Sequence, residues 1–134
     1  MIITGYRSFV DALTSLTVVG VQRKYTEPPK SISSADLPAM YPGLPSGEET
    51  AMTFQTAGGW PTLICDLIVV VEAVAQDTQS VNFAATVDIM DNLSSVLRQA
   101  SIGRAALTWT MTTNVQVQIA GTTYWAVVAT INGR

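Results

Sequence analysis

Residues 61–75 read PTLICDLIVVVEAVA and contain the longest apolar run of the chain. Apolar residues occupy both alternating sets of positions, a pattern typical of a central strand that is covered on both faces. Asp66 and Glu72 interrupt the run, which is also shorter than the ~20 residues needed to span a bilayer. The stretch therefore predicts the central strand of a sheet in a protein with no membrane partner, and other elements must cover its two faces.

Patterns downstream of this strand predict a helix and a hairpin. Apolar residues at helical spacing predict a helix that ends near Gly103, and they are Phe83, Val87, Met90, Leu93 and Leu97. The C-terminal third alternates apolar and polar residues on both sides of Ala120-Gly121. We expect residues 107–119 and 122–131 to form an antiparallel pair, with all the even-numbered polar residues of the first strand on one face.

Upstream of the central strand, the sequence predicts a helix and two further strands. Apolar spacing predicts a helix over residues 5–17 that Thr4 caps. Val18–Tyr25 is rich in residues that favour a strand. Residues 50–56 alternate weakly and precede a turn at residues 57–59, so they are expected to pair with the central strand as a hairpin.

Residues 27–49 form a proline-rich segment, which we call the arm. Its five prolines exclude regular helix and leave room for a short edge strand at Leu37–Tyr41. Such segments serve as binding arms or packed connectors, and we expect deletion of residues 28–48 to spare folding. The prediction for residues 1–134 is thus a single α+β domain: a mostly antiparallel sheet with two helices packed on it and a proline-rich extended arm.

The residue types available for chemistry are few. The chain has no histidine and one cysteine, which excludes Ser-His-Asp and Cys-His catalysis and the usual zinc and iron sites. Asp66 and Glu72 would lie roughly 20 Å apart on an extended strand, too far to act as a catalytic pair. Cys65, within the apolar run, is expected to be buried and inert. We therefore expect no catalytic residue, no metal site and no cofactor, and an active site assembled from distant carboxylates is the least favoured alternative.

Charge composition limits the classes of partner. Charged residues make up 13% of the chain, about half the usual share, and the net charge is −3. A chain without a basic surplus is not expected to bind nucleic acid sequence-specifically. The first 19 residues lack the continuous apolar segment of a signal peptide, so we expect a soluble protein made in the cytoplasm.

A chain of this kind is expected to work by binding proteins through its surface. Basic residues gather at the end of the first strand and the start of the arm, where a solvated edge is the ordinary interpretation and contact with an acidic neighbour is the alternative. A sheet face rich in Thr, Asn and Gln costs less to desolvate than a charged one. The candidate contact residues are Arg23, Lys24, Lys30, Asp36, Leu37, Tyr41, Gln116 and Gln118.

The segment Ser33-Ser34-Ala35-Asp36-Leu37-Pro38-Ala39, the order of elements and the strand after Trp60 resemble the tail terminator proteins of phages with long non-contractile tails. The resemblance implies a structural virion protein of the tail and neck, made in the host cytoplasm. It implies a hexameric ring that caps the tail tube and joins it to the capsid neck, with DNA passing through. The implied partners are copies of the chain, the tail tube protein and a neck or head-completion protein.

Two other functions remain open at this level. A head-completion or neck adaptor of the same machinery has a similar size and α+β character, and composition does not separate it from a terminator. A small bacterial ligand-binding domain is less favoured, because no segment gathers charged residues around a pocket.

Overall fold

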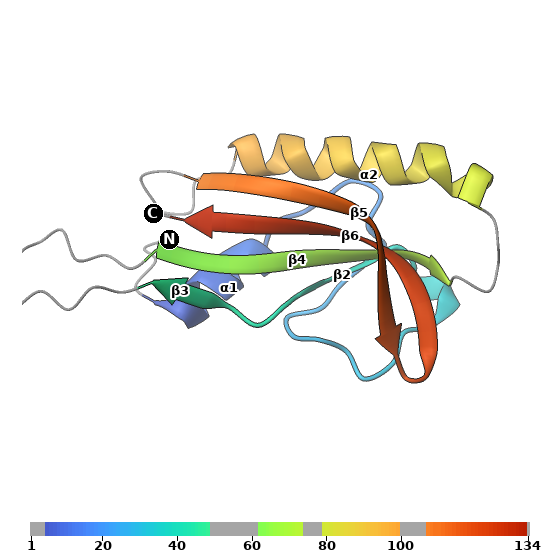
Figure 1. The fold of residues 1–134 in the computed structure, drawn as a ribbon, viewed down its shortest axis with the longest axis horizontal. Coiled ribbons are helices and arrows are strands. Elements are labelled where there is room, and N and C mark those ends of the chain that lie inside the picture. The colour runs from blue at the N-terminus through green and yellow to red at the C-terminus, as the bar shows by residue number, and fades with distance from the viewer. Residues whose placement is uncertain (1–4, 49–61, 74–78, 100–106, 134) are drawn as a thin grey trace, which may run out of the picture.

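The protein has an α+β fold in a computed structural model that describes residues 5–48, 62–73, 79–99 and 107–133 (Figure 1). The expected class, a mostly antiparallel sheet with two helices, is confirmed. In chain order the elements are α1 (Tyr6–Thr14), β1 (Arg23–Lys24), a 3-10 turn η1 (Ser34–Asp36), β2 (Ala39–Pro42), β3 (Ser46–Glu48), β4 (Thr62–Ala73), α2 (Gln79–Gln99), β5 (Leu107–Ile119) and β6 (Thr122–Gly133).

The sheet has the strand order β1-β2-β4-β6-β5, and β3 pairs with the first residues of β4. β1 and β2 run parallel, and the other described pairs are antiparallel. β4 occupies the middle and pairs with β6 from Leu63 opposite Gly133 to Ala73 opposite Tyr124. The prediction of a central strand at this position is confirmed, but the expectation that both of its faces are covered is correct in full only for the helix side, because Ile64, Asp66 and Ile68 on the other face are half-buried.

Both helices pack on the same face of the sheet and form the main core with it. Phe9 and Leu13 of α1 and Leu93 of α2 are fully buried there, together with alternate residues of β4. Those residues are Leu63, Cys65, Leu67, Val69 and Val71. The odd-numbered half of the apolar run therefore faces the helices.

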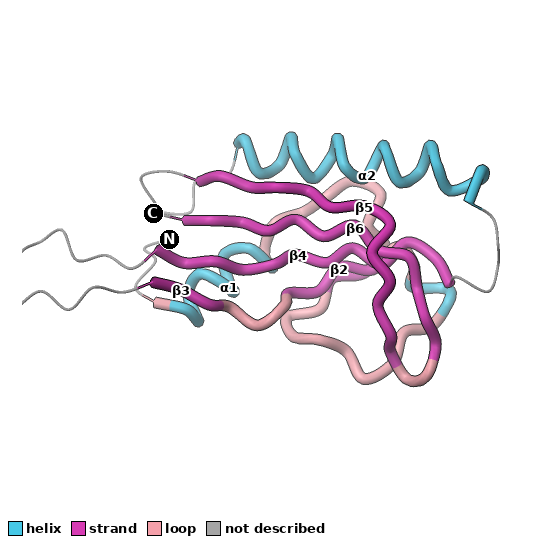
Figure 2. The backbone as a smooth tube through the Cα atoms, in the orientation of Figure 1, coloured by secondary structure: helices cyan, strands magenta, loops and turns pink. Residues whose placement is uncertain are grey.

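A smaller cluster covers one end of the opposite face. Its buried residues come from four strands, and they are Tyr41, Val70, Ile119 and Tyr124. The distal half of the β5–β6 hairpin bends over this end of the sheet (Figure 2). Register shifts between Thr112 and Val115 and between Val70 and Glu72 accompany the bend, because bulges increase the local twist of a strand.

The N-terminal helix is shorter than the one expected over residues 5–17. It ends at Thr14, where the Ser15 hydroxyl donates to the Ala12 carbonyl at 2.7 Å and competes with further helix. Gly5 occupies the capping position, and Thr4, the expected cap, lies outside the described residues.

The strand expected over Val18–Tyr25 is wrong except at Arg23–Lys24. The Val21 amide donates to the Val18 carbonyl at 3.2 Å, and Gly20 adopts a φ of 95°, so the chain turns where the sequence favoured a strand. Gly20 makes this turn without the steric cost that a side chain would have at positive φ.

The arm is partly built into the sheet. β2 lies between β1 and β4, and all four of its residues are buried, so the expected edge strand at Leu37–Tyr41 is corrected to an interior strand at Ala39–Pro42. Met40 enters the main core and Tyr41 the smaller cluster on the opposite face. Deleting residues 28–48 would therefore remove core residues, which reverses the expectation that folding survives it.

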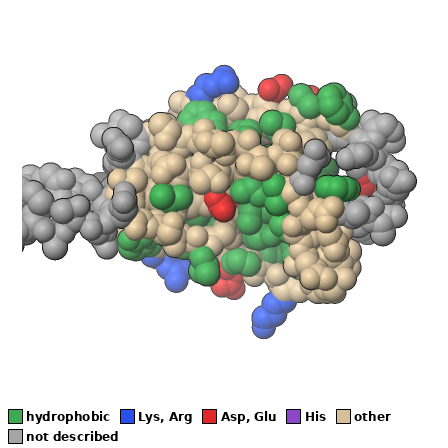
Figure 3. All heavy atoms as spheres, in the orientation of Figure 1, with side chains coloured by type: hydrophobic (Ala, Val, Ile, Leu, Met, Phe, Trp, Pro, Cys, Tyr) green, Lys and Arg blue, Asp and Glu red, His purple; other side chains and the backbone are tan. Residues whose placement is uncertain are grey.

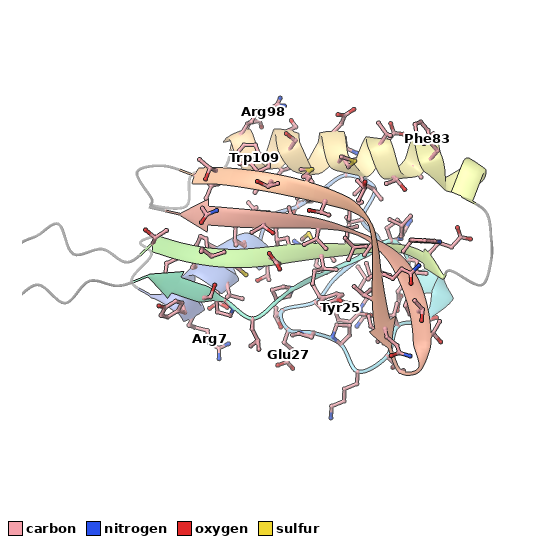
Figure 4. All side chains as sticks on the ribbon, in the orientation of Figure 1. Arg7, Tyr25, Glu27, Phe83, Arg98 and Trp109 are labelled. Carbon is pink, nitrogen blue, oxygen red and sulfur yellow. The ribbon has the colours of Figure 1, made fainter. Side chains whose placement is uncertain are left out.

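The second helix matches its predicted position, but its predicted apolar stripe is only partly correct. Leu93 and Leu97 are buried, whereas Phe83 is 71% exposed. Figure 4 shows Phe83 on the outer side of α2, away from the strands. Among residues 83–99, whose burial the structure describes, the first buried residue is Ile89, so this part of α2 packs through its C-terminal half.

The remaining predictions fall on the C-terminal hairpin and on undescribed segments. The hairpin is confirmed, and its turn places Ala120 and Gly121 at φ of 53° and 82°, as two-residue turns of this kind require. The strand expected at residues 50–56, the turn at residues 57–59 and the helix end near Gly103 lie outside the described residues.

Candidate protein-contact surface

The basic cluster expected from the sequence lies at the β1 edge of the sheet. Arg23 is 57% exposed, its guanidinium is 3.9 Å from an Asp36 carboxylate oxygen, and it lies 5.2 Å from the centre of the Tyr25 ring. Lys24 donates from Nζ to the Ser15 carbonyl at 3.4 Å. An exposed ion pair of this kind contributes little stability, so these groups remain available to a partner.

Lys30 and Leu37 follow in the same loop, and Tyr41 lies in the strand after it. Lys30 is exposed, whereas Leu37 is half-buried against the smaller cluster. Tyr41 is 7% exposed, and burial raises the pKa of its phenol. Tyr41 is therefore corrected from a candidate contact residue to a core residue, because β2 is an interior strand.

Gln116 and Gln118 are exposed, but they do not lie on the face expected for them. The sequence pattern assigned them to the same face as Thr108, Thr110 and Thr112. The register shift between Thr112 and Val115 reverses the alternation, so the glutamines lie opposite Trp125 and Thr123 while Val117 and Ile119 turn toward the smaller cluster.

Over the other half of its length, the face opposite the helices is not covered by any of the residues that the structure describes. Three cross-strand rows run over β4, β6 and β5 there, and we call these residues the front face: Ile64, Asn132 and Thr108; Asp66, Thr130 and Thr110; Ile68, Val128 and Thr112. The β5 threonines are exposed and the other six residues are half-buried; Ile68, in the third row, packs against the smaller cluster and marks the border of the face. The helix-side core lies behind this face, and Figure 3 views it from the front.

The front face has one charge, on Asp66. Thr130 donates its hydroxyl to an Asp66 carboxylate oxygen at 2.8 Å. Among its other members are half-buried aliphatic residues from two strands, Ile64, Ile68 and Val128. A sheet surface of hydroxyls and aliphatic groups with a single carboxylate is better suited to contact with a protein than to bond-breaking chemistry.

Sequence reasoning missed a second feature beside this face. Leu44 is 91% exposed, and it follows Gly43, whose amide donates to the Asp66 carbonyl at 2.8 Å. A Cβ atom built on Gly43 would lie 3.3 Å from the Asp66 Cβ, so this segment borders the front face. One signal in the sequence could have identified Leu44 as exposed. It is an apolar residue between Pro42 and Pro45, in a segment where no periodicity predicts a buried strand or helix.

Three further properties of the described residues concern metal binding, membrane spanning and thiol chemistry. They hold no group of three or more metal-ligating side chains. No helix in the described part of the chain is long and apolar enough to cross a membrane. Cys65 is 1% exposed, and burial, followed by the negative charge of Asp66, raises the pKa of its thiol to about 11, so it is protonated at neutral pH.

Three of the predicted contact residues lie together, and the other five are spread over the loop, the core and the hairpin. Arg23, Lys24 and Asp36 lie at or beside the β1 edge, and Lys30 follows in the adjoining loop. Tyr41 is internal, and the two glutamines lie on the distal hairpin.

No protein-family model matches this sequence, and no curated protein matches it.

Proposed function

We propose that this chain is a structural subunit that assembles with copies of itself, as the tail terminator ring of a phage with a long non-contractile tail. The observation that carries the proposal is the front face, a sheet surface with one charge that the described residues leave uncovered. Burying such a face against a protein costs less than burying a charged one.

Two further observations support this function. The order of elements, from a short helix and strand through the Asp36-Leu37-Pro38-Ala39 step to a sheet, a helix and a final strand pair, agrees with the resemblance described above. The whole sequence has no histidine and one cysteine, and that cysteine is buried with a raised pKa. The side chains at the surface therefore suit contact between proteins, whereas a catalytic site would lack histidine and an accessible thiol.

A tail terminator acts through the shape of the ring that its subunits form. Subunits that meet head to tail, each through two different patches, close into a ring if the rotation between neighbours allows it. A closed ring on the end of a tail tube covers the surface that the next tube subunit would bind, and it offers its other side to the capsid neck. DNA passes through the ring without sequence-specific contact.

The test is assembly on tail tubes. Purified full-length protein, alone and mixed with tail tubes, is examined by light scattering after gel filtration and by negative-stain electron microscopy. We expect closed rings, of six subunits if the resemblance holds, bound at tube ends. A strictly monomeric protein that ignores tube ends would contradict the proposal, and binding to the neck side only would favour a neck adaptor.

A further inference from the structure

The outer edge of β5 is the longest sheet edge that the described residues leave without a partner strand. β5 is the last strand of the sheet, and no other described residue makes a backbone hydrogen bond to it outside its ladder with β6. Its 13 residues include neither a charged residue nor a proline. Edge strands are usually kept from pairing by such residues or by shortness, as β1 is with only two residues, both cations. The β5 edge is therefore suited to pairing with an extended segment of another chain.

One flank of α2 faces the β5 edge and carries exposed apolar side chains. The Asn92 side chain donates to the Val19 carbonyl at 2.8 Å, in the connection from α1 to β1, so its flank of the helix faces the β1 side of the sheet. Phe83, Val87 and Met90 lie on the other flank, because an α-helix turns once in about 3.6 residues and the buried residues of α2 lie between the two flanks. Phe83 is 71% and Val87 39% exposed, and α2 runs alongside β5 in Figure 1.

Residues 50–56, with the sequence TAMTFQT, lie outside the described residues and are predicted from the sequence to form a strand. The partner expected for them was the central strand. However, β6 pairs along one edge of β4, and β3 and β2 pair with the other. The segment has no charge, and Met52 and Phe54 alternate with polar residues. A strand of this composition therefore needs an open edge other than those of β4.

We propose that residues 50–56 of one subunit pair as a strand with the β5 edge of the next copy. Met52 and Phe54 then lie against the apolar flank of α2, and the polar residues between them lie beside the front-face threonines of β5. Main-chain hydrogen bonds supply the affinity of such a contact, and the alternating side chains supply its specificity.

The inference rests on the proposed function and names the contact by which the ring closes. Residues 50–56 follow β3, and two strands, β4 and β6, separate β3 from β5 in the sheet. The segment would have to cross the sheet to reach the β5 edge of its own chain, whereas the edge of another copy can be brought to it. The two patches differ, so the contact is head to tail, as a ring requires.

Charges on the flank of α2 test the receiving side. The double variant Phe83→Asp, Val87→Asp would place two carboxylates under the added strand, where their desolvation opposes binding, and we expect it to remain monomeric. The matched control is Ala84→Asp, Ser95→Asp, which adds the same charge to the same helix at exposed positions. These positions lie on the side of α2 opposite the sheet, so the control should form rings as the wild type does.

Phe54→Asp tests the inserting side and leaves β5 and α2 unchanged. Alone it should also be monomeric. In an equimolar mixture with Phe83→Asp, Val87→Asp, one chain offers an intact segment and the other an intact edge. One contact can then form, so native mass spectrometry should detect dimers and no rings. A mixture that stays monomeric would show that the two patches do not meet.

Far-ultraviolet circular dichroism of each variant should match that of the wild type. Loss of the folded signal in either one would show that these residues stabilise the subunit itself, which would overturn the inference. Rings formed by either variant alone, as abundant as those of the wild type, would also overturn it and leave the terminator function standing. A wild-type protein that forms no ring, either alone or on tube ends, would refute both.

Discussion

Cys65 shows how position changes the chemistry of one side chain. It lies on the central strand with 1% of its surface exposed, and its thiol is close to the carbonyl oxygens of Gly43 and Asp66. Burial raises its pKa from 9.0 to about 11, with a smaller contribution from the charge of Asp66. The expectation of a buried cysteine is confirmed, and the raised pKa follows from the same burial.

The raised pKa predicts a loss of stability in alkali. Between pH 9 and about 11 the unfolded chain releases the thiol proton while the folded chain keeps it, so stability is complete below pH 9 and falls as pH rises through the folded pKa. This group accounts for a fall on the order of 2 kcal/mol. Urea unfolding at pH 8, 10 and 11 measures it.

Cys65→Ala is the control for this measurement. The variant is less stable at every pH because it leaves a small cavity, but it lacks the titrating thiol. Its free energy of unfolding should therefore fall less between pH 9 and 11 than that of the wild type. Parallel pH curves for the two proteins would show that the thiol does not contribute.

Among single residues, the candidate contact site was only partly predictable. Arg23, Lys24 and Lys30 are charged residues in a polar stretch, and local pattern is enough to expect them at the surface. Tyr41 and Leu44 have similar apolar surroundings in the sequence, yet one is 7% and the other 91% exposed. The difference arises because β2 is inserted between β1 and β4 and ends at Pro42.

At the scale of elements, the arm contains both core and surface. Met40 is 1% exposed in the helix-side core, and Leu44, four residues later, is 91% exposed. Met40→Asp should abolish cooperative unfolding, because an unpaired carboxylate in the core costs several kcal/mol. Leu44→Asp should change the free energy of unfolding by less than about 0.5 kcal/mol.

Thermal unfolding followed by circular dichroism compares the two variants, and a chain lacking residues 28–48 extends the comparison to the whole segment. We expect this deletion to lose the folded signal, since β2 is removed with it. A deletion protein that still unfolds cooperatively would contradict the interior position of β2.

The bend in β5 is a second effect at the scale of elements. Before the register shift the even-numbered residues of β5 lie on the front face, and after it the odd-numbered residues Val117 and Ile119 are on that side. The bend therefore divides one apparent polar face into an open threonine surface and a covered end.

At the scale of the whole molecule, the sheet separates two clusters of unequal size. The helix-side cluster holds most of the buried apolar residues. The smaller cluster joins the distal hairpin to the loop before β2, through Tyr124, whose hydroxyl donates to the Ile32 carbonyl at 3.5 Å. The loop that carries Lys30 is therefore held in place mainly by the smaller cluster.

Tyr124→Ala should release this loop. We expect a loss of about 2–4 kcal/mol in the free energy of unfolding and faster tryptic cleavage after Lys24 and Lys30, because local opening needs fewer contacts to break. Tyr124→Phe keeps the ring and loses only a long hydrogen bond, so its cleavage rate should stay near that of the wild type. Limited proteolysis with mass spectrometry measures the rates, and equal rates for the two variants would exclude this role of the cluster.

The sequence by itself determined the elements whose pattern is local. The central strand β4, the C-terminal hairpin with its Ala120-Gly121 turn and the position of α2 follow from apolar periodicity and from turn residues, which act over a few neighbouring positions. The scarcity of reactive side chains also follows from the sequence alone.

Only the tertiary structure decided which surfaces stay open. The interior place of β2, the reversal of faces in β5 and the uncovered front face depend on strand order, on register and on both helices packing on one side. These are pairings between residues far apart in the chain, and no local period encodes them. For that reason the sequence indicated the candidate contact surface only as a polar pattern, while the extent and the boundaries of that surface came from the fold.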